Sequence, residues 1–88
     1  MAEAFVPVIH PSLFLVMKRF PDQKDALRQL YRTSETFQSI CQNYQKCEEA
    51  LQFWTASEDE SAPERQKEYA QLLQELELEI MNSLEDSA

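Results

Sequence analysis

The residues that could carry acid–base or nucleophilic chemistry are few in this sequence. His10 is the only histidine, and it precedes Pro11 at the expected entrance of a helix. A Ser-His-Asp site needs a nucleophile and an acid arranged around the imidazole, and the sequence near His10 does not suggest such a set. We therefore expect His10 to lie at the surface or to cap a helix, and we predict no catalytic residue and no enzymatic activity.

The two cysteines could in principle be redox-active or bind a metal. Cys41 and Cys47 would lie roughly 240° apart around a helix, so they cannot bridge each other within it. Cys-x5-Cys with one distant histidine is not a zinc-binding set, and the sequence lacks the Glu-x-x-His pairs of a di-iron bundle. Lys46 is the only nearby cation, and Glu48 and Glu49 oppose it. We expect two reduced, packed thiols, as in a cytoplasmic protein, and neither a metal nor a cofactor.

A basic line is formed by Lys24, Arg28 and Arg32, which recur every four residues. Such a line on an exposed helix is one way to contact phosphates, although a solvated face or pairing with a partner's acids explains it more simply. The net charge of the chain is −8, and residues 45–88 hold twelve of its sixteen acids. This acidity disfavours nucleic acid and anionic membranes as partners and favours a basic protein. The absence of glycine also argues against phosphate-binding loops.

Two long segments with helical spacing would position these groups. Residues 21–56 are predicted to form one continuous helix, with Pro21 in its first turn. Residues 57–61 form a connection, and Ser61-Ala62-Pro63-Glu64 has the pattern of a capping box that opens a second helix over residues 62–85. A short connection makes the helices antiparallel neighbours. The sequence therefore predicts one all-α domain over residues 1–88, built on an antiparallel helical hairpin.

The N-terminal stretch is expected to complete the core. The first long helix would be ~54 Å long and the second ~36 Å, which leaves the first without a partner over its initial turns. A short helix over residues 12–20, capped by Ser12, is predicted to fold back on this open end, preceded by an extended arm over residues 1–11. Two alternatives are an interfacial membrane helix and a partner-binding element. Prolines interrupt the apolar run, which is shorter than the ~20 residues of a membrane span.

In each long helix the apolar side chains that recur every three or four residues form a stripe along one face. Some apolar residues do not fit either stripe. Phe53 lies off the stripe beside Trp54, and Leu78 and Met81 lie three residues apart, away from the main face of the second helix. Extra apolar faces often mark association, although scattered surface hydrophobes are also common. The predicted partner-binding residues are Phe53, Trp54, Leu78, Met81, Lys24, Arg28 and Arg32.

Several short motifs carry a resemblance to known proteins. His-Pro, Phe-Pro-Asp, Leu-Tyr-Arg and Cys-x-x-Tyr are followed by Ala-Pro-Glu-Arg at the start of the second helix. With them, residues 10–84 resemble a group of small bacterial helical-hairpin proteins, and the first long helix is more distantly similar to YdcH-like hairpins. The resemblance implies a bacterial, cytoplasmic hairpin and brings no assigned activity and no catalytic residue.

The combined expectation is a small cytoplasmic association or adaptor module that acts through helix faces. We expect it to form a homodimer or to pair with another helical protein. Nucleic-acid or nucleoid-associated binding through the basic line is the alternative.

Overall fold

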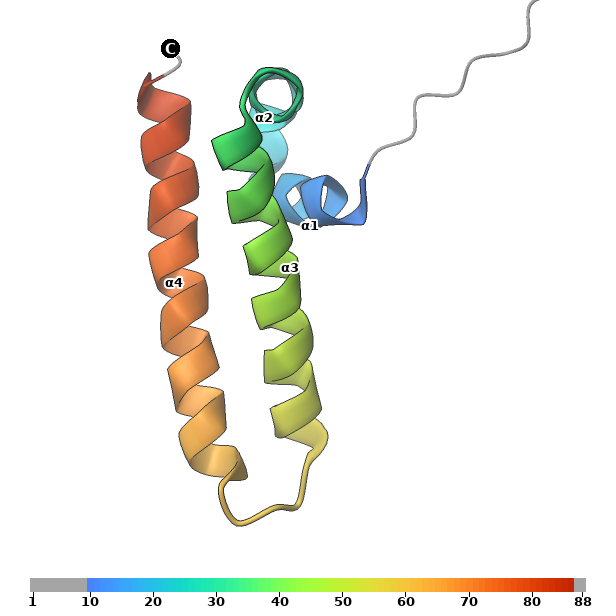
Figure 1. Cartoon of the computed structure of the whole chain (residues 1–88), viewed down its shortest axis with the longest axis vertical. Helices are drawn as coiled ribbons and strands as arrows, with labels where there is room; N and C mark the ends of the chain where they lie inside the picture. Colours follow the sequence, from blue (N-terminus) through green and yellow to red (C-terminus); the bar gives the residue numbers. More distant parts are fainter. Residues whose placement is uncertain (1–9, 87–88) are drawn as a thin grey trace, which may run out of the picture.

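The computed structural model describes residues 10–86, and within this range it contains four α-helices, one 3-10 turn and no strand (Figure 1). The prediction of an all-α fold is confirmed. Residues 1–9 of the expected N-terminal arm lie outside the described residues, and Pro11 belongs to the first helix. The elements are α1 (Pro11–Arg19), η1 (Pro21–Gln23), α2 (Lys24–Thr33), α3 (Glu35–Ala56) and α4 (Ala62–Asp86).

Helices α3 and α4 form the predicted antiparallel hairpin and run side by side along the longest axis of the molecule (Figure 1). Near the connection, the side-chain amide of Gln66 donates to the carbonyl of Trp54 at 3.0 Å. Farther along, the hydroxyl of Tyr44 donates to the carboxylate of Glu77 at 2.8 Å. These pairs are expected for two antiparallel helices joined by a short loop. A residue of α3 then lies beside the residue of α4 that is about equally far from the loop.

The start of α4 differs from the predicted capping box. In a capping box the Glu64 side chain would accept the backbone N–H of Ser61. Instead, the N–H and the hydroxyl of Ser61 both donate to the carboxylate of Asp59, at 2.9 and 2.7 Å. These bonds lower the pKa of Asp59, the backbone bond having the larger effect. The helix therefore begins where the sequence predicts, but the carboxylate that accepts the Ser61 N–H belongs to Asp59 and not to Glu64.

The prediction of one continuous helix over residues 21–56 is wrong, because the chain turns at Ser34. Its extended backbone (φ −134°, ψ 114°) separates α2 from α3, and its hydroxyl accepts the N–H of Phe37 at 3.1 Å. The N–H of Ser34 donates to the carbonyl of Leu30, and the side chain of Gln38 donates to the carbonyl of Tyr31. Serine is a favoured N-cap, so the bend leaves few backbone groups unsatisfied. The apolar spacing continues across it, which concealed the break.

Because of this bend, α2 crosses the open end of the hairpin and does not extend it. Figure 1 shows α2 end-on where α3 is seen from the side. Helix α2 contacts α1, α3 and α4, and Leu27 is completely buried. The unpartnered overhang expected from the sequence does not form, since the turn brings Leu27 onto the other helices.

Replacement of Ser34 by alanine tests this capping role. We expect Ser34→Ala to lower the free energy of unfolding by about 1 kcal/mol, because the Phe37 N–H loses its acceptor. Urea denaturation followed by circular dichroism measures the change. Ser39→Ala, at an exposed position inside α3, is the matched control and should have little effect. Equal losses in the two variants would contradict the assignment of Ser34 as the cap.

Helix α1 confirms the predicted N-terminal helix, with two corrections. Its N-cap is His10 and not Ser12, which is fully buried inside the helix. The helix packs mainly along the side of α3, while α2 occupies the open end. Val16 and Met17 are buried in the shared core, whereas Phe14, on the same helix, remains 54% exposed.

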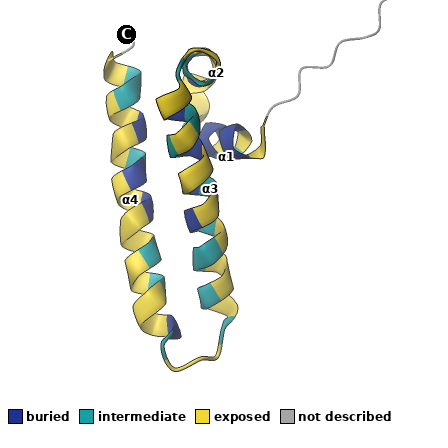
Figure 2. Cartoon of the chain, in the orientation of Figure 1, coloured by how far each residue is buried: buried dark blue, intermediate teal, exposed yellow. Residues whose placement is uncertain are grey.

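The core lies where α1 and α2 meet the upper half of the hairpin. Figure 2 shows buried residues on α1 and on the facing sides of α3 and α4 in this half, with more exposed residues toward the connection. Near the connection only the small side chain of Ala62 is buried, because two helices alone leave most side chains partly open to solvent. The core residues are Leu13, Val16, Met17, Leu27, Phe37, Cys41, Tyr44, Cys47, Leu73, Leu76 and Ile80.

Candidate functional site

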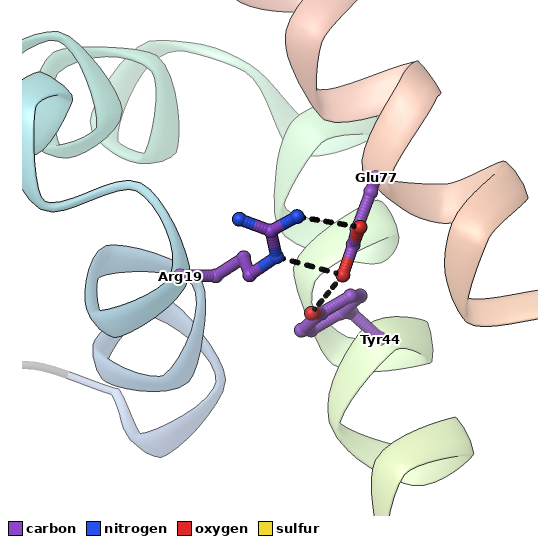
Figure 3. Close-up of polar contacts among 3 residues, drawn as sticks. All are labelled: Arg19, Tyr44 and Glu77. Atoms are coloured by element: carbon purple, nitrogen blue, oxygen red, sulfur yellow. Dashed lines mark hydrogen bonds and ion pairs between the residues drawn. The ribbon is translucent and has the colours of Figure 1, made fainter. Parts of the chain in front are cut away.

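A polar junction connects α1, α3 and α4 on the side of the hairpin against which α1 packs (Figure 3). The guanidinium of Arg19, at the end of α1, donates two hydrogen bonds to the carboxylate of Glu77 on α4, at 3.1 and 3.2 Å. The hydroxyl of Tyr44 on α3 donates to the same carboxylate at 2.8 Å. Such two-pronged, charge-assisted bonds fix geometry as well as adding energy. The junction therefore sets the position of α1 across the hairpin.

Electrostatics show what this junction can do chemically. Burial raises the pKa of the Tyr44 phenol, and its hydrogen bond to Glu77 raises it further. The same carboxylate raises the pKa of the Arg19 guanidinium through its hydrogen bond and its charge. Both donors stay protonated across the physiological range, and three hydrogen bonds engage the carboxylate. This arrangement is suited to holding helices together, since neither donor has a pKa near neutrality for proton transfer.

The sequence analysis did not single out Glu77, although the signal was present. Its neighbours Leu76 and Ile80 are on the buried stripe, so Glu77 lies at the edge of the apolar face of α4. A carboxylate at such an edge needs a partner. Only the fold could show that its partners come from α1 and α3.

Truncating the two ends of the junction should have unequal effects. Glu77→Ala leaves the Tyr44 hydroxyl, on a residue only 4% exposed, without its acceptor, and we expect a loss of about 1–3 kcal/mol. Arg19→Ala removes one half-exposed partner of an ion pair, and we expect a loss of about 0.2–1 kcal/mol. Urea denaturation at pH 7 compares the two. An Arg19→Ala loss as large as that of Glu77→Ala would contradict this account.

His10 confirms its expected capping role and shows one contact that the sequence analysis overlooked. Its Nδ1 accepts the backbone N–H of Ser12 at 3.1 Å and lies 2.8 Å from the Ser12 hydroxyl. A histidine beside a serine hydroxyl is part of a nucleophilic arrangement. Here Ser12 is completely buried, so a substrate cannot approach its oxygen. The ring of His10 stacks on Tyr31 at 6.0 Å between centroids, which ties the start of α1 to α2.

Both cysteines are free and buried, as the sequence predicts. Burial raises the pKa of the Cys41 thiol to about 12. It also raises the pKa of Cys47, whose thiol donates to the carbonyl of Tyr69 at 3.3 Å. Thiols of this kind are poor nucleophiles. Among residues 10–86, no group of three or more histidine, cysteine or acidic residues is placed to hold a metal ion.

The basic line lies on the exposed side of α2. Lys24, Arg28 and Arg32 are all exposed, and Arg28 contacts the carboxylate of Asp25 at 3.2 Å. The structure adds Lys18 from α1 to this group. A hollow of 560 Å³ between α1 and α2 is lined by Phe14, Met17, Lys18, Pro21, Lys24 and Arg28. Arg32 is not part of this lining.

The four predicted apolar contact residues form two separate groups. Phe53 and Trp54 meet edge to face at 5.1 Å near the connection, with Phe53 65% exposed. Leu78 and Met81, also largely exposed, are at the opposite end of α4. Trp54 lies beside Gln66, to which it is hydrogen-bonded, and the distance along α4 from Gln66 to Met81 is roughly 22 Å. The predicted residues therefore belong to at least three surfaces.

A further apolar surface was missed by the sequence analysis. A hollow of 340 Å³ between α3 and α4 is lined by Asn43, Lys46, Cys47, Ala50, Tyr69, Leu72 and Leu76. Leu72 is 42% exposed, whereas the next residue, Leu73, is buried. The apolar face of α4 is wider than its contact with α3, so Leu72 lies at the margin of the hairpin.

The comparisons with known proteins identify no relative. No protein-family model, no curated protein sequence and no solved structure matches this chain. The resemblance to small bacterial helical hairpins therefore stays a prediction. Within the described residues, no helix has the length and apolar character needed to cross a membrane.

Proposed function

We propose that this chain is a protein–protein association module that acts through its helix faces and catalyses no reaction itself. The observation that carries this proposal is the exposure of five large apolar side chains, Phe14, Phe53, Leu72, Leu78 and Met81. Three of them, Phe14, Leu72 and Met81, also line open hollows.

Exposed apolar side chains of this size favour a protein partner. A chain this short buries a smaller fraction of its surface on folding than a large domain does, and association is a common way to bury more. The hollow between α3 and α4 is open on the face of the hairpin and is lined mainly by apolar groups, including Tyr69, Leu72 and Leu76. A helix of a partner protein packed in this hollow would contact both α3 and α4. The partner in our proposal is a second copy or another helical protein.

The observations favour association over nucleic-acid binding. Of the three cations in the basic line, Arg28 already contacts Asp25. Asp22 and Asp25 lie in the same stretch as Lys24, and α4 is strongly acidic. A nucleic acid laid along α2 would meet these acids as well as the cations. A cytoplasmic location is part of the proposal, since two free thiols suit a reducing compartment.

Site-specific photocrosslinking in living cells tests the association role. A photoreactive phenylalanine analogue would replace Phe53, Leu72, Leu78 or Met81 in turn, and Gln42, an exposed polar position on α3, would serve as the matched control. We expect adducts of defined mass from at least one apolar position and none from Gln42. If none of the four positions gave an adduct beyond the level of the control, the proposed function would be overturned.

A further inference from the structure

The hollow between α1 and α2 combines an apolar floor with a cationic rim. Phe14, Met17 and Pro21 form the apolar part, and Lys18, Lys24 and Arg28 supply the cations. The ammonium of Lys18 lies 5.6 Å from the centroid of the exposed Phe14 ring. Five of the eight basic residues of the chain fall within residues 18–32. In a chain of net charge −8, this is the place where an acidic and apolar surface would be attracted.

The end of α4 carries a surface of this complementary kind. Leu78 and Met81 are three residues apart and exposed, so they form an apolar pair on one side of the helix. Glu75 precedes Leu78 by three residues and Glu85 follows Met81 by four, and both are exposed. Carboxylates therefore flank the apolar pair at each end. We call Glu75, Leu78, Met81 and Glu85 the acidic end of α4.

The two surfaces are neighbours in the molecule. A smaller hollow of 230 Å³ is lined by Phe20, Gln23, Met81, Leu84 and Glu85. It joins the acidic end of α4 to residues 20–23, and Pro21 of this segment also lines the cationic hollow. The cationic hollow and the acidic end of α4 therefore border the same short segment around η1.

This arrangement permits reciprocal pairing of two copies. In a two-fold symmetric interface, each contact between surface i and surface j is made twice. Two molecules related by an axis near η1 would place the acidic end of each α4 in the cationic hollow of the other. Elsewhere, two copies of an acidic chain would bring like charges together, because Lys46, Arg65 and Lys67 are the only basic residues after residue 44.

We propose that two copies of this chain associate through this reciprocal contact, with Leu78 and Met81 against Phe14 and with Glu75 and Glu85 beside Lys24 and Arg28. This rests on the proposed association function and specifies its partner and its surface. The other occupants of the cationic hollow, an acidic segment of a different protein or a phosphate backbone, are outcomes of the test.

Charge reversal in two complementary pairs tests the contact. The first variant, Lys24→Glu/Arg28→Glu, makes the hollow acidic, and the second, Glu75→Lys/Glu85→Lys, makes the end of α4 basic. All four positions are exposed, and circular dichroism checks that each variant folds. Glu58→Lys/Glu60→Lys, at exposed positions in the connection, changes the net charge equally and is the control for the second variant. Sedimentation equilibrium over a hundredfold concentration range measures the dimer dissociation constant.

We expect the unmodified chain and the control to dimerise and each reversed variant to bind itself at least about tenfold more weakly. A mixture of the two reversed variants should restore the dimer, because both contacts in the mixed pair then join opposite charges. The chain carrying all four reversals should dimerise by itself for the same reason. Restoration would exclude a general effect of net charge.

Other outcomes would overturn the proposal and remain distinct from failure of the association role. A monomer at all concentrations, with photocrosslinks in cells to another protein, would leave association intact and remove the second copy as partner. Dimers of equal strength in all variants would place the contact elsewhere. Retention of a monomeric chain by a DNA or RNA oligonucleotide at low salt, abolished by Lys24→Glu/Arg28→Glu, would assign the hollow to phosphates instead.

Discussion

Replacing Phe37 with alanine is expected to lower the free energy of unfolding by about 3–5 kcal/mol. Phe37 is 1% exposed and is the largest side chain in the fully buried part of the core. It lies in the first turn of α3, immediately after the bend at Ser34. Removing its ring takes away apolar contacts and leaves a cavity that the surrounding helices can fill only in part.

This loss is large compared with the total stability of a small domain, which is about 5–15 kcal/mol. Urea denaturation gives the change in free energy, and hydrogen exchange shows which helices lose protection first. The matched control is Phe53→Ala, which removes the same ring from a position 65% exposed and should change stability by about 0.5 kcal/mol or less. Similar losses in both variants would show that the core is not arranged as described.

Stability is expected to fall steeply at alkaline pH. Burial raises the pKa of Cys41 from 9.0 to about 12 and raises that of Tyr44 above its ordinary value of 10.0. Both groups are neutral when protonated, so the folded state holds these protons more tightly than the unfolded state does. Their stabilising contribution is complete below the unfolded pKa values and is lost as the pH rises from there toward the folded ones.

Each such group lowers the free energy of unfolding by about 1.4 kcal/mol per pH unit within its window. For Cys41 the window runs from about pH 9 to about pH 12, and Tyr44 adds its share above about pH 10. Urea denaturation at pH 8, 9.5 and 11 would measure the fall, which we expect to reach about 4 kcal/mol by pH 11 from the two groups together.

A variant without the thiol at position 41 separates this effect from general charge repulsion. Cys41→Ala should be less stable than the parent at pH 8, because a buried group is truncated, but should lose less stability between pH 8 and 11. The comparison therefore uses the slope with pH and not the absolute stability. Identical slopes in parent and variant would rule out Cys41 as a cause of the alkaline loss.

Part of the candidate surface could be predicted from the sequence. The exposure of Phe53, Leu78 and Met81 followed from their place outside the apolar stripes, since a residue off the stripe points away from the core. The exposure of Lys24, Arg28 and Arg32 followed in the same way. Whether any of these residues contacts a partner stays a prediction.

The grouping of these residues could not be predicted. Lys18 joins Lys24 and Arg28 around one hollow because α1 and α2 turn back on each other at η1. Glu77 joins Arg19 although 58 residues separate them in the sequence. Periodicity reports which side of its own helix a residue faces and contains no information about which other helix lies there.

The sequence by itself determined the helical nature of the chain, the connection at residues 57–61 and the antiparallel pairing of α3 with α4. These depend on local spacing, capping residues and the length of a loop, which a single sequence contains. Only the tertiary structure decided that the chain bends at Ser34. A straight helix would satisfy the same apolar spacing but would leave Leu27 without cover. The bend costs few backbone hydrogen bonds, because Ser34 caps α3, and it buries Leu27 against the other helices.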